Sequence, residues 1–89
     1  MNAWEWEAGP ASGLSDDRRK ARRRAAGWLR SGEAGKAVMC KVTVVPGQPI
    51  PGGNYLPVAG TRVEGRMDER RIRWRRVPDA IVSGRREVA

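Results

Sequence analysis

Histidine is absent from this chain of 89 residues, and cysteine occurs only once, at Cys40. One cysteine excludes an intramolecular disulfide, and the shortage of both residue types excludes zinc sites that need four Cys or His ligands. Cys40 lies within an alternating apolar run, where a free cysteine usually acts as a small buried hydrophobic residue. The sequence therefore predicts no disulfide and no bound metal.

The lack of histidine also removes the commonest general acid or base. The groups that remain are carboxylates, Lys, Tyr55 and Cys40, and most of the carboxylates stand close to arginines, whose charge keeps a carboxyl group ionised. Gly47, Gly52 and Gly53 lie in a segment without the Gly-Lys-Ser/Thr ending of a phosphate-binding loop. We therefore expect a protein that is not an enzyme and that uses no cofactor and no small-molecule substrate.

Long apolar runs are missing as well. No stretch approaches the ~18 consecutive apolar residues that a membrane-spanning helix needs. The N-terminus carries Glu5 and Glu7 and has no leucine-rich core, so it lacks the pattern of a signal peptide. These features predict a cytoplasmic protein that does not contact membranes.

Positive charge is what the chain has in excess, with 18 Lys and Arg against 10 Asp and Glu and a net charge of +8. The excess falls in two blocks: residues 15–32 carry seven cations and two acids, and residues 61–78 carry seven arginines and three acids. Basic patches of this kind are the electrostatic footprint of nucleic-acid binding. Arginine greatly outnumbers lysine, a bias that a GC-rich genome would also produce.

The N-terminal segment alternates Trp4 and Trp6 with Glu5 and Glu7 and then enters a Gly-Pro-rich stretch. In an extended conformation the two indoles share one face and the two carboxylates share the other. Because termini are ordered only when the rest of the fold holds them, we expect residues 1–13 to form a flexible acidic and aromatic arm with exposed, partner-binding Trp4 and Trp6. The alternatives are an edge strand, or folding back over the basic surface.

Residues 16–30 are predicted to form a helix. Ser15 is the expected N-cap, acids follow in the first turn, and Gly32 is the expected C′ residue. At about 100° per residue, one stripe of this helix is apolar and an arginine ridge runs along the opposite side. The stripe holds Leu14, Ala21, Ala25, Trp28 and Leu29, Arg18 and Arg22 border it, and the ridge holds Arg19, Arg23 and Arg30.

Residues 36–45 are predicted to form a central strand that is partly covered on both faces. Its alternating apolar positions are Val38, Cys40, Val42 and Val44. Residues 46–54 hold three Pro and three Gly and predict a loop. Pro57 limits residues 55–59 to a short edge strand or an extended connection.

Residues 61–67 and 71–77 are predicted to form a hairpin with one apolar and one charged face. The expected register pairs Arg66 with Arg71 through an even loop of two or four residues around Asp68-Glu69. The apolar face holds Val63, Met67, Ile72 and Trp74, with Gly65 leaving room for a neighbouring ring. The charged face holds Glu64, Arg62, Arg66, Arg71, Arg73 and Arg75.

These elements predict an α+β fold, with one N-terminal helix packed on a small curled antiparallel sheet of three to four strands. An SH3-like or OB-like half-barrel is a candidate architecture for such a sheet. The domain is expected to span residues 14–82, preceded by the arm at residues 1–13 and followed by a frayed tail at residues 83–89.

The two arginine surfaces predict a non-catalytic module that binds DNA or structured RNA, because the planar guanidinium fork matches phosphate and stacks on bases. The candidate contact residues are Arg19, Arg23 and Arg30 on the helix and Arg62, Arg66, Arg71, Arg73 and Arg75 on the hairpin. The two surfaces would clamp one polyanion if they face the same way and bridge two if they face apart. Trp28 and Trp74 are expected to pack in the core.

The alternative is a protein–protein assembly or inhibitor module of virion or mobile-element type. Trp and Arg are the residue types most enriched at interface hot spots. In such a module Trp4 and Trp6 of the arm, together with the arginine face, would be the contact surfaces, and an arm could dock on the basic face of a second copy.

Overall fold

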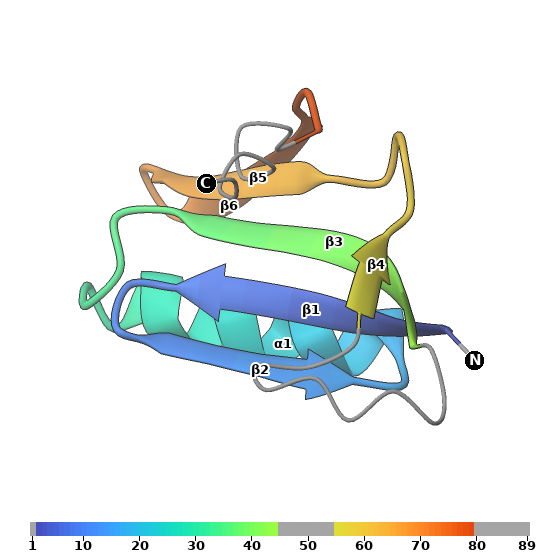
Figure 1. The fold of residues 1–89 in the computed structure, drawn as a ribbon. Coiled ribbons are helices and arrows are strands. Elements are labelled where there is room, and N and C mark those ends of the chain that lie inside the picture. The colour runs from blue at the N-terminus through green and yellow to red at the C-terminus, as the bar shows by residue number, and fades with distance from the viewer. Residues whose placement is uncertain (1, 45–54, 80–89) are drawn as a thin grey trace.

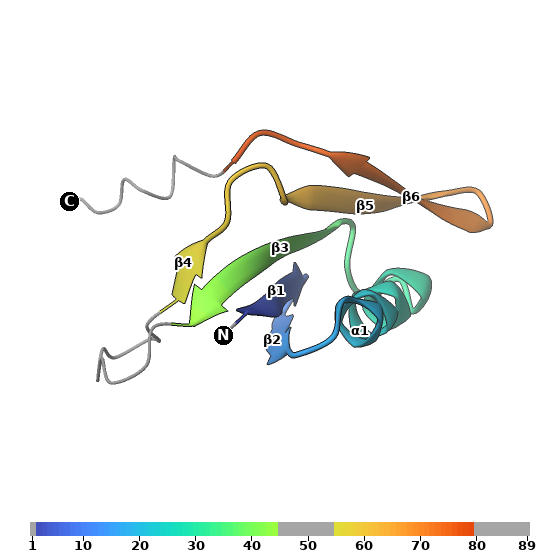
Figure 2. The ribbon, with the colours of Figure 1, turned by 90° about the vertical axis from the view of Figure 1, so that its right-hand side faces the viewer.

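The computed structural model describes residues 2–44 and 55–79, which form one helix and a six-stranded antiparallel sheet. In chain order the elements are β1 (Asn2–Ala8), β2 (Ala11–Ser15), α1 (Arg18–Arg30), β3 (Ala37–Val44), β4 (Tyr55–Pro57), β5 (Val63–Asp68) and β6 (Arg71–Arg76). The strands lie in the order β2-β1-β3-β5-β6, and β4 pairs with the C-terminal end of β3 (Figure 1). Because the helix covers one face of the sheet (Figure 2), the predicted α+β class is confirmed, with six strands instead of three to four.

Strand β1 lies inside the sheet, between β2 and β3, so the prediction of a flexible arm is wrong for the described residues 2–13. The alternation seen in the sequence is that of a paired strand, because Trp4 and Trp6 face the helix and the carboxylates of the intervening acids are exposed on the other face. The sequence favoured a free terminus, with an edge strand as one alternative, whereas β1 is paired along both edges, which satisfies its backbone and holds it in place.

The Gly-Pro stretch that looked like a breaker is a tight turn. Gly9 and Pro10 join β1 to β2, with Ala8 paired to Ala11. Gly9 has a φ of 60°, and a Cβ at this position would lie 2.8 Å from the carbonyl oxygen of Glu33. Only glycine fits this close approach in this backbone conformation.

Helix α1 begins two residues later than predicted, because Asp17 and not Ser15 is its N-cap. The Asp17 backbone is extended, and its Oδ1 accepts a hydrogen bond from the Arg19 N–H at 2.8 Å. Ser15 ends β2, and its Oγ accepts a hydrogen bond from the Asp17 N–H. The predicted C-terminal end is confirmed, since Gly32 has a φ of 85°, the left-handed conformation of a C′ residue.

The helix packs on the sheet through small side chains, which let the two elements approach closely. The fully buried alanines of this interface are Ala8, Ala21, Ala25 and Ala37. Leu29 and Met39, which are 2% and 1% exposed, fill the space between them. The predicted apolar stripe is therefore the core face of α1, except that Leu14 lies in β2 and is exposed.

Strand β3 is central, as predicted, with β1 along one edge and β4 and β5 along the other. Ala37 and Met39 face the helix, and Cys40 and Val42 are buried on the opposite face, so both faces of the strand are covered. Strand β4 corresponds to the predicted short strand. The predicted loop at residues 46–54 and the predicted tail at residues 83–89 lie outside the described residues.

The β5–β6 hairpin has the predicted faces, but its register differs by two residues. Arg71 pairs with Asp68 across a two-residue turn, whereas the predicted partner was Arg66. The observed register places Trp74 opposite Gly65, where a Cβ would lie 2.7 Å from the indole. Because a two-residue shift keeps every side chain on its face, the alternation does not distinguish the two registers. The packing of the indole against the glycine distinguishes them.

Candidate nucleic-acid interface

One flank of helix α1 is rich in arginine. Positions three, four, seven and eleven residues after Arg19 lie on the same side of an α-helix as Arg19 itself. In α1 these positions hold Arg22, Arg23, Ala26 and Arg30. This flank faces the β5–β6 hairpin. Arg30 also lies in the last turn, where a cation interacts favourably with the helix dipole.

The hairpin supplies the opposite wall. Ile72 and Trp74 point from β6 toward the helix and pack against the core. Arg70 lies in the turn, and Arg71 is the first residue of β6. Figure 2 shows this end of the hairpin reaching out beside α1.

The helix and the hairpin flank an open groove of about 550 Å³, which we call the arginine groove. Six of its nine lining residues are arginines, and the other three give it an apolar base. The arginines are Arg19, Arg22, Arg23, Arg30, Arg70 and Arg71, and the apolar residues are Ala26, Ile72 and Trp74. The two basic blocks of the sequence therefore meet in one place.

A cation–π contact joins the two walls. The guanidinium carbon of Arg22 lies 5.2 Å from the centroid of the Trp74 ring. Such contacts contribute about 0.5–1 kcal/mol at exposed sites and more when they are desolvated. The contact ties the helix flank to the hairpin and positions one face of the groove.

The charge of the arginine groove is not neutralised by carboxylates within residues 2–44 and 55–79. None of its lining residues is acidic. The salt bridges in the described ranges involve Lys20, Arg66 and Arg73, none of which lines the groove. Six clustered like charges repel one another, and a bound polyanion would relieve that repulsion.

The structure divides the eight arginines predicted as contact residues into two groups. Four of them line the arginine groove: Arg19, Arg23, Arg30 and Arg71. The other four, Arg62, Arg66, Arg73 and Arg75, lie outside it. Alternation places Arg66, Arg73 and Arg75 on the hairpin face that points away from α1. Arg71 belongs to the same face but lines the groove from the turn end of β6.

Two of the outlying arginines are held by acids of β5. Arg66 Nε donates to Glu64 Oε2 at 2.7 Å, and Arg73 forms a salt bridge with Asp68. The hydrogen bond from Arg66 holds the pKa of Glu64 below its ordinary value, and the charges of Arg66, Lys36 and Arg75 lower it further. These contacts neutralise part of the charged hairpin face and make it a weaker site for phosphate than the groove.

Sequence reasoning missed Arg22 and Arg70 as members of the site. Arg22 borders the apolar stripe of the helix. This position could have identified it as a site residue, because a side chain at the border of a core face reaches toward the neighbouring element. Arg70 follows Glu69, which has a φ of 64° at the turn. It lies in the turn of the hairpin, and it lines the groove because this turn lies beside α1.

Trp4 and Trp6 are not the exposed aromatic pair that the sequence predicted. Trp6 is 6% exposed and belongs to the core beneath α1. Trp4 is half-buried, and the Arg18 guanidinium lies 5.4 Å from its ring centroid. Both indoles lie on the helix-facing side of β1, and because β1 is an internal strand, neither extends toward a partner from a free arm.

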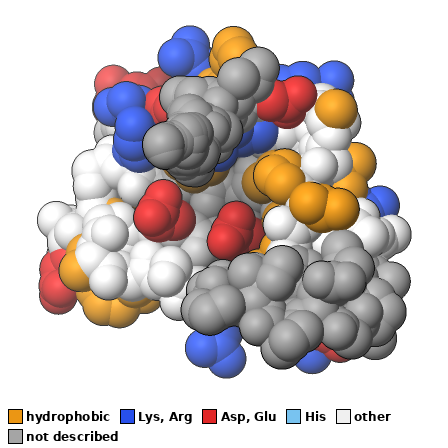
Figure 3. Space-filling view, in the orientation of Figure 1, with side chains coloured by type: hydrophobic (Ala, Val, Ile, Leu, Met, Phe, Trp, Pro, Cys, Tyr) orange, Lys and Arg blue, Asp and Glu red, His pale blue; other side chains and the backbone are white. Residues whose placement is uncertain are grey.

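The sheet face opposite the helix has a different character. Glu5 and Glu7 are exposed there and line a hollow of about 250 Å³ together with Arg62. Figure 3 shows this face, with acidic side chains over the middle of the sheet and cations gathered toward the part that β5 and β6 occupy in Figure 1. This face therefore carries acidic side chains over the middle of the sheet and cations beside them at the hairpin (Figure 3).

Comparison with protein-family models, curated proteins and solved structures found no match to this chain. Within the described residues no group of three or more His, Cys, Asp or Glu side chains is placed to hold a metal ion. No helix in the same ranges is long and apolar enough to cross a membrane.

Proposed function

We propose that this protein is a non-catalytic module that binds nucleic acid through the arginine groove. The observation that carries the proposal is the meeting of six arginines from two distant parts of the chain around an apolar base, without a carboxylate among the lining residues. Guanidinium groups bind phosphate oxygens in a bidentate manner, and their flat faces stack on bases. The apolar base offers contact to sugars and base edges between phosphates. The SH3-like or OB-like half-barrel stays a prediction.

The arrangement supports a clamp more than a bridge. The helix ridge and the hairpin tip line the same groove, so a single strand or duplex edge would touch both basic blocks at once. Arg66 and Arg73, on the other hairpin face, already have acidic partners. One polyanion in one groove is therefore the arrangement that the described contacts favour.

A salt titration tests the proposal directly. Labelled DNA and RNA would be titrated with the full chain at several salt concentrations, and the logarithm of the association constant plotted against the logarithm of the salt concentration. Release of counterions by phosphate contacts gives a linear fall with a slope of about −0.9 per contact for duplex and about −0.7 for single strands. Absence of binding at low salt would overturn the proposal.

The assembly alternative is favoured by one observation, the exposure of Glu5 and Glu7 on the face that lies opposite the helix. Under this alternative, the acidic face of one copy docks on the arginine groove of the next. Deleting residues 1–13 does not test it, because the deletion removes internal strand β1. Sedimentation of the unchanged protein and of a Glu5→Gln, Glu7→Gln variant tests the alternative. It is contradicted if the unchanged protein does not self-associate at low salt, or if the variant self-associates equally.

A further inference from the structure

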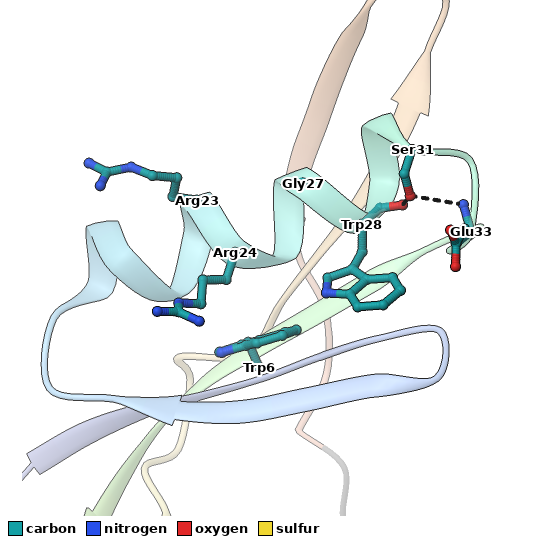
Figure 4. A pocket seen from close by; sticks show the side chains of 7 residues that line it. All are labelled: Trp6, Arg23, Arg24, Gly27, Trp28, Ser31 and Glu33. Atoms are coloured by element: carbon teal, nitrogen blue, oxygen red, sulfur yellow. Dashed lines mark hydrogen bonds between the residues drawn. The ribbon is translucent and has the colours of Figure 1, made fainter.

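A second hollow, of about 440 Å³, lies on the other flank of α1 and has two indoles in its wall. We call it the tryptophan hollow. Trp28 projects from the helix, and Trp6 comes from β1 below it (Figure 4). Its volume lies within the range of about 300–1,000 Å³ that is usual for small-molecule sites, and it is widely open to solvent.

The two rings have different roles in the wall. Trp6 is 6% exposed and forms the buried base, where its ring is packed so closely against β2 that a Cβ on Gly13 would lie 2.8 Å from it. Trp28 is half-buried, so part of its indole faces the hollow. The exposed aromatic surface therefore belongs mainly to Trp28.

Hydrogen bonds at the end of α1 hold Trp28 in place. Its carbonyl oxygen accepts from Ser31 Oγ at 2.8 Å and from the Ala34 N–H at 3.3 Å. Ser31 Oγ in turn accepts from the Glu33 N–H at 3.2 Å (Figure 4). The backbone that carries the ring is thus fixed before a ligand arrives, which lowers the entropy cost of binding.

The hollow has a basic side and an acidic side. Arg23 and Arg24 lie toward the start of the helix, and Glu33 lies beyond its end (Figure 4). A nucleotide has the matching polarity, with an anionic phosphate at one end and a flat base that carries hydrogen-bond donors at the other. Its phosphate would lie toward the arginines, and its base would lie against Trp28 with any amino group toward the Glu33 carboxylate.

Arg23 connects this hollow with the arginine groove, because it lines both. A strand whose phosphates lie in the groove would pass Arg23 and bring a neighbouring base to Trp28. We propose that the tryptophan hollow binds one unstacked base of a single-stranded nucleic acid whose phosphates occupy the arginine groove. This inference rests on the proposed function and narrows its ligand, since the bases of a duplex are stacked and are not free to enter the hollow.

The test compares three labelled ligands of equal length by fluorescence anisotropy with the full chain: a single strand, the same strand with abasic sites throughout, and a duplex. The single strand is expected to bind more tightly than the abasic strand, although both carry the same phosphates. Trp28→Ala is expected to weaken binding of the single strand by about 5- to 150-fold, the usual range for loss of one base–aromatic contact. The same substitution should leave binding of the abasic strand unchanged.

Trp28→Phe is the matched control, because it keeps an aromatic face and should recover most of the affinity. Circular dichroism establishes that the variants are folded, and the comparison of the two strands on the unchanged protein needs no variant. Equal binding of all three ligands, with Trp28→Ala without effect, would overturn this inference and leave the proposed function standing. Failure of every ligand to bind at low salt would overturn both.

Discussion

The Arg22 guanidinium lies over the indole of Trp74, with 5.2 Å between its carbon and the ring centroid, and this contact links helix α1 to strand β6. Trp74 also packs against Gly65 of the neighbouring strand and against the core. One aromatic ring therefore sets both the register of the hairpin and its position beside the helix. The arginine groove exists because these two elements are held at this separation.

A double-mutant cycle would measure the link between Arg22 and Trp74. We expect the free energies of unfolding of Arg22→Gln, Trp74→Leu and the double variant to give a coupling of about 0.5–1 kcal/mol, the range of exposed cation–π pairs. The same cycle with Arg23→Gln is the control, since Arg23 lies on the same flank but does not lie over the ring. Equal coupling in both cycles would mean that the contact contributes nothing specific.

Neutralising groove arginines should weaken nucleic-acid binding more than neutralising the same number elsewhere. We expect Arg30→Gln with Arg70→Gln to reduce the salt slope by about 2, which is one per lost phosphate contact, and to lower affinity by about tenfold or more per arginine at low salt. Arg75→Gln with Arg76→Gln changes the net charge equally, but neither residue lines the groove. Anisotropy titrations that show the same loss for both pairs would indicate attraction by net charge alone.

Two glycine substitutions should have opposite effects on stability. Gly65→Ala places a Cβ 2.7 Å from the Trp74 indole, and we expect the resulting displacement of the ring to cost about 1–3 kcal/mol. Gly27→Ala meets no atom within 4 Å in helix α1, and we expect it to stabilise the protein by about 0.5–1 kcal/mol through helix propensity. Urea unfolding measures both, and a neutral Gly65→Ala would show that the ring does not determine the register.

Acid should destabilise the protein partly through Glu64. The pKa of Glu64 in the folded state lies below its ordinary value of 4.5, chiefly because of the hydrogen bond from Arg66. A lowered folded-state pKa contributes stability above the unfolded-state value, and this contribution is lost as the pH falls through the folded-state value. Below about pH 4.5, the free energy of unfolding should therefore fall more steeply in the unchanged protein than in Glu64→Gln. Parallel curves from urea unfolding at a series of pH values would contradict this.

The local periodicity of the sequence predicted most of the individual elements correctly. The helical stripe, the left-handed Gly32, the central strand and the two faces of the hairpin were all predicted from spacing and residue type, and the structure confirms them. Gly65 was also read correctly as space for a ring. The signal for each of these features lies in residues that are neighbours in sequence or across one turn.

Errors arose where a feature depends on distant residues. Residues 2–13 look like a free terminus until β3 and α1 are placed beside them, and the hairpin register is ambiguous until Trp74 is placed on Gly65. The candidate site shows the same limit, since Arg22 and Arg70 line one groove only when helix and hairpin lie side by side.

The sequence alone determined that this protein has a large excess of arginine in two blocks and which face of each element carries it, because charge and periodicity are properties of the chain itself. Only the tertiary structure decided that helix arginines and the hairpin tip line one groove while the charged hairpin face points away from it. The reason is physical: alternation sets the side of an element on which a residue lies, but the packing of Trp74 and the small alanines of the core sets which sides meet.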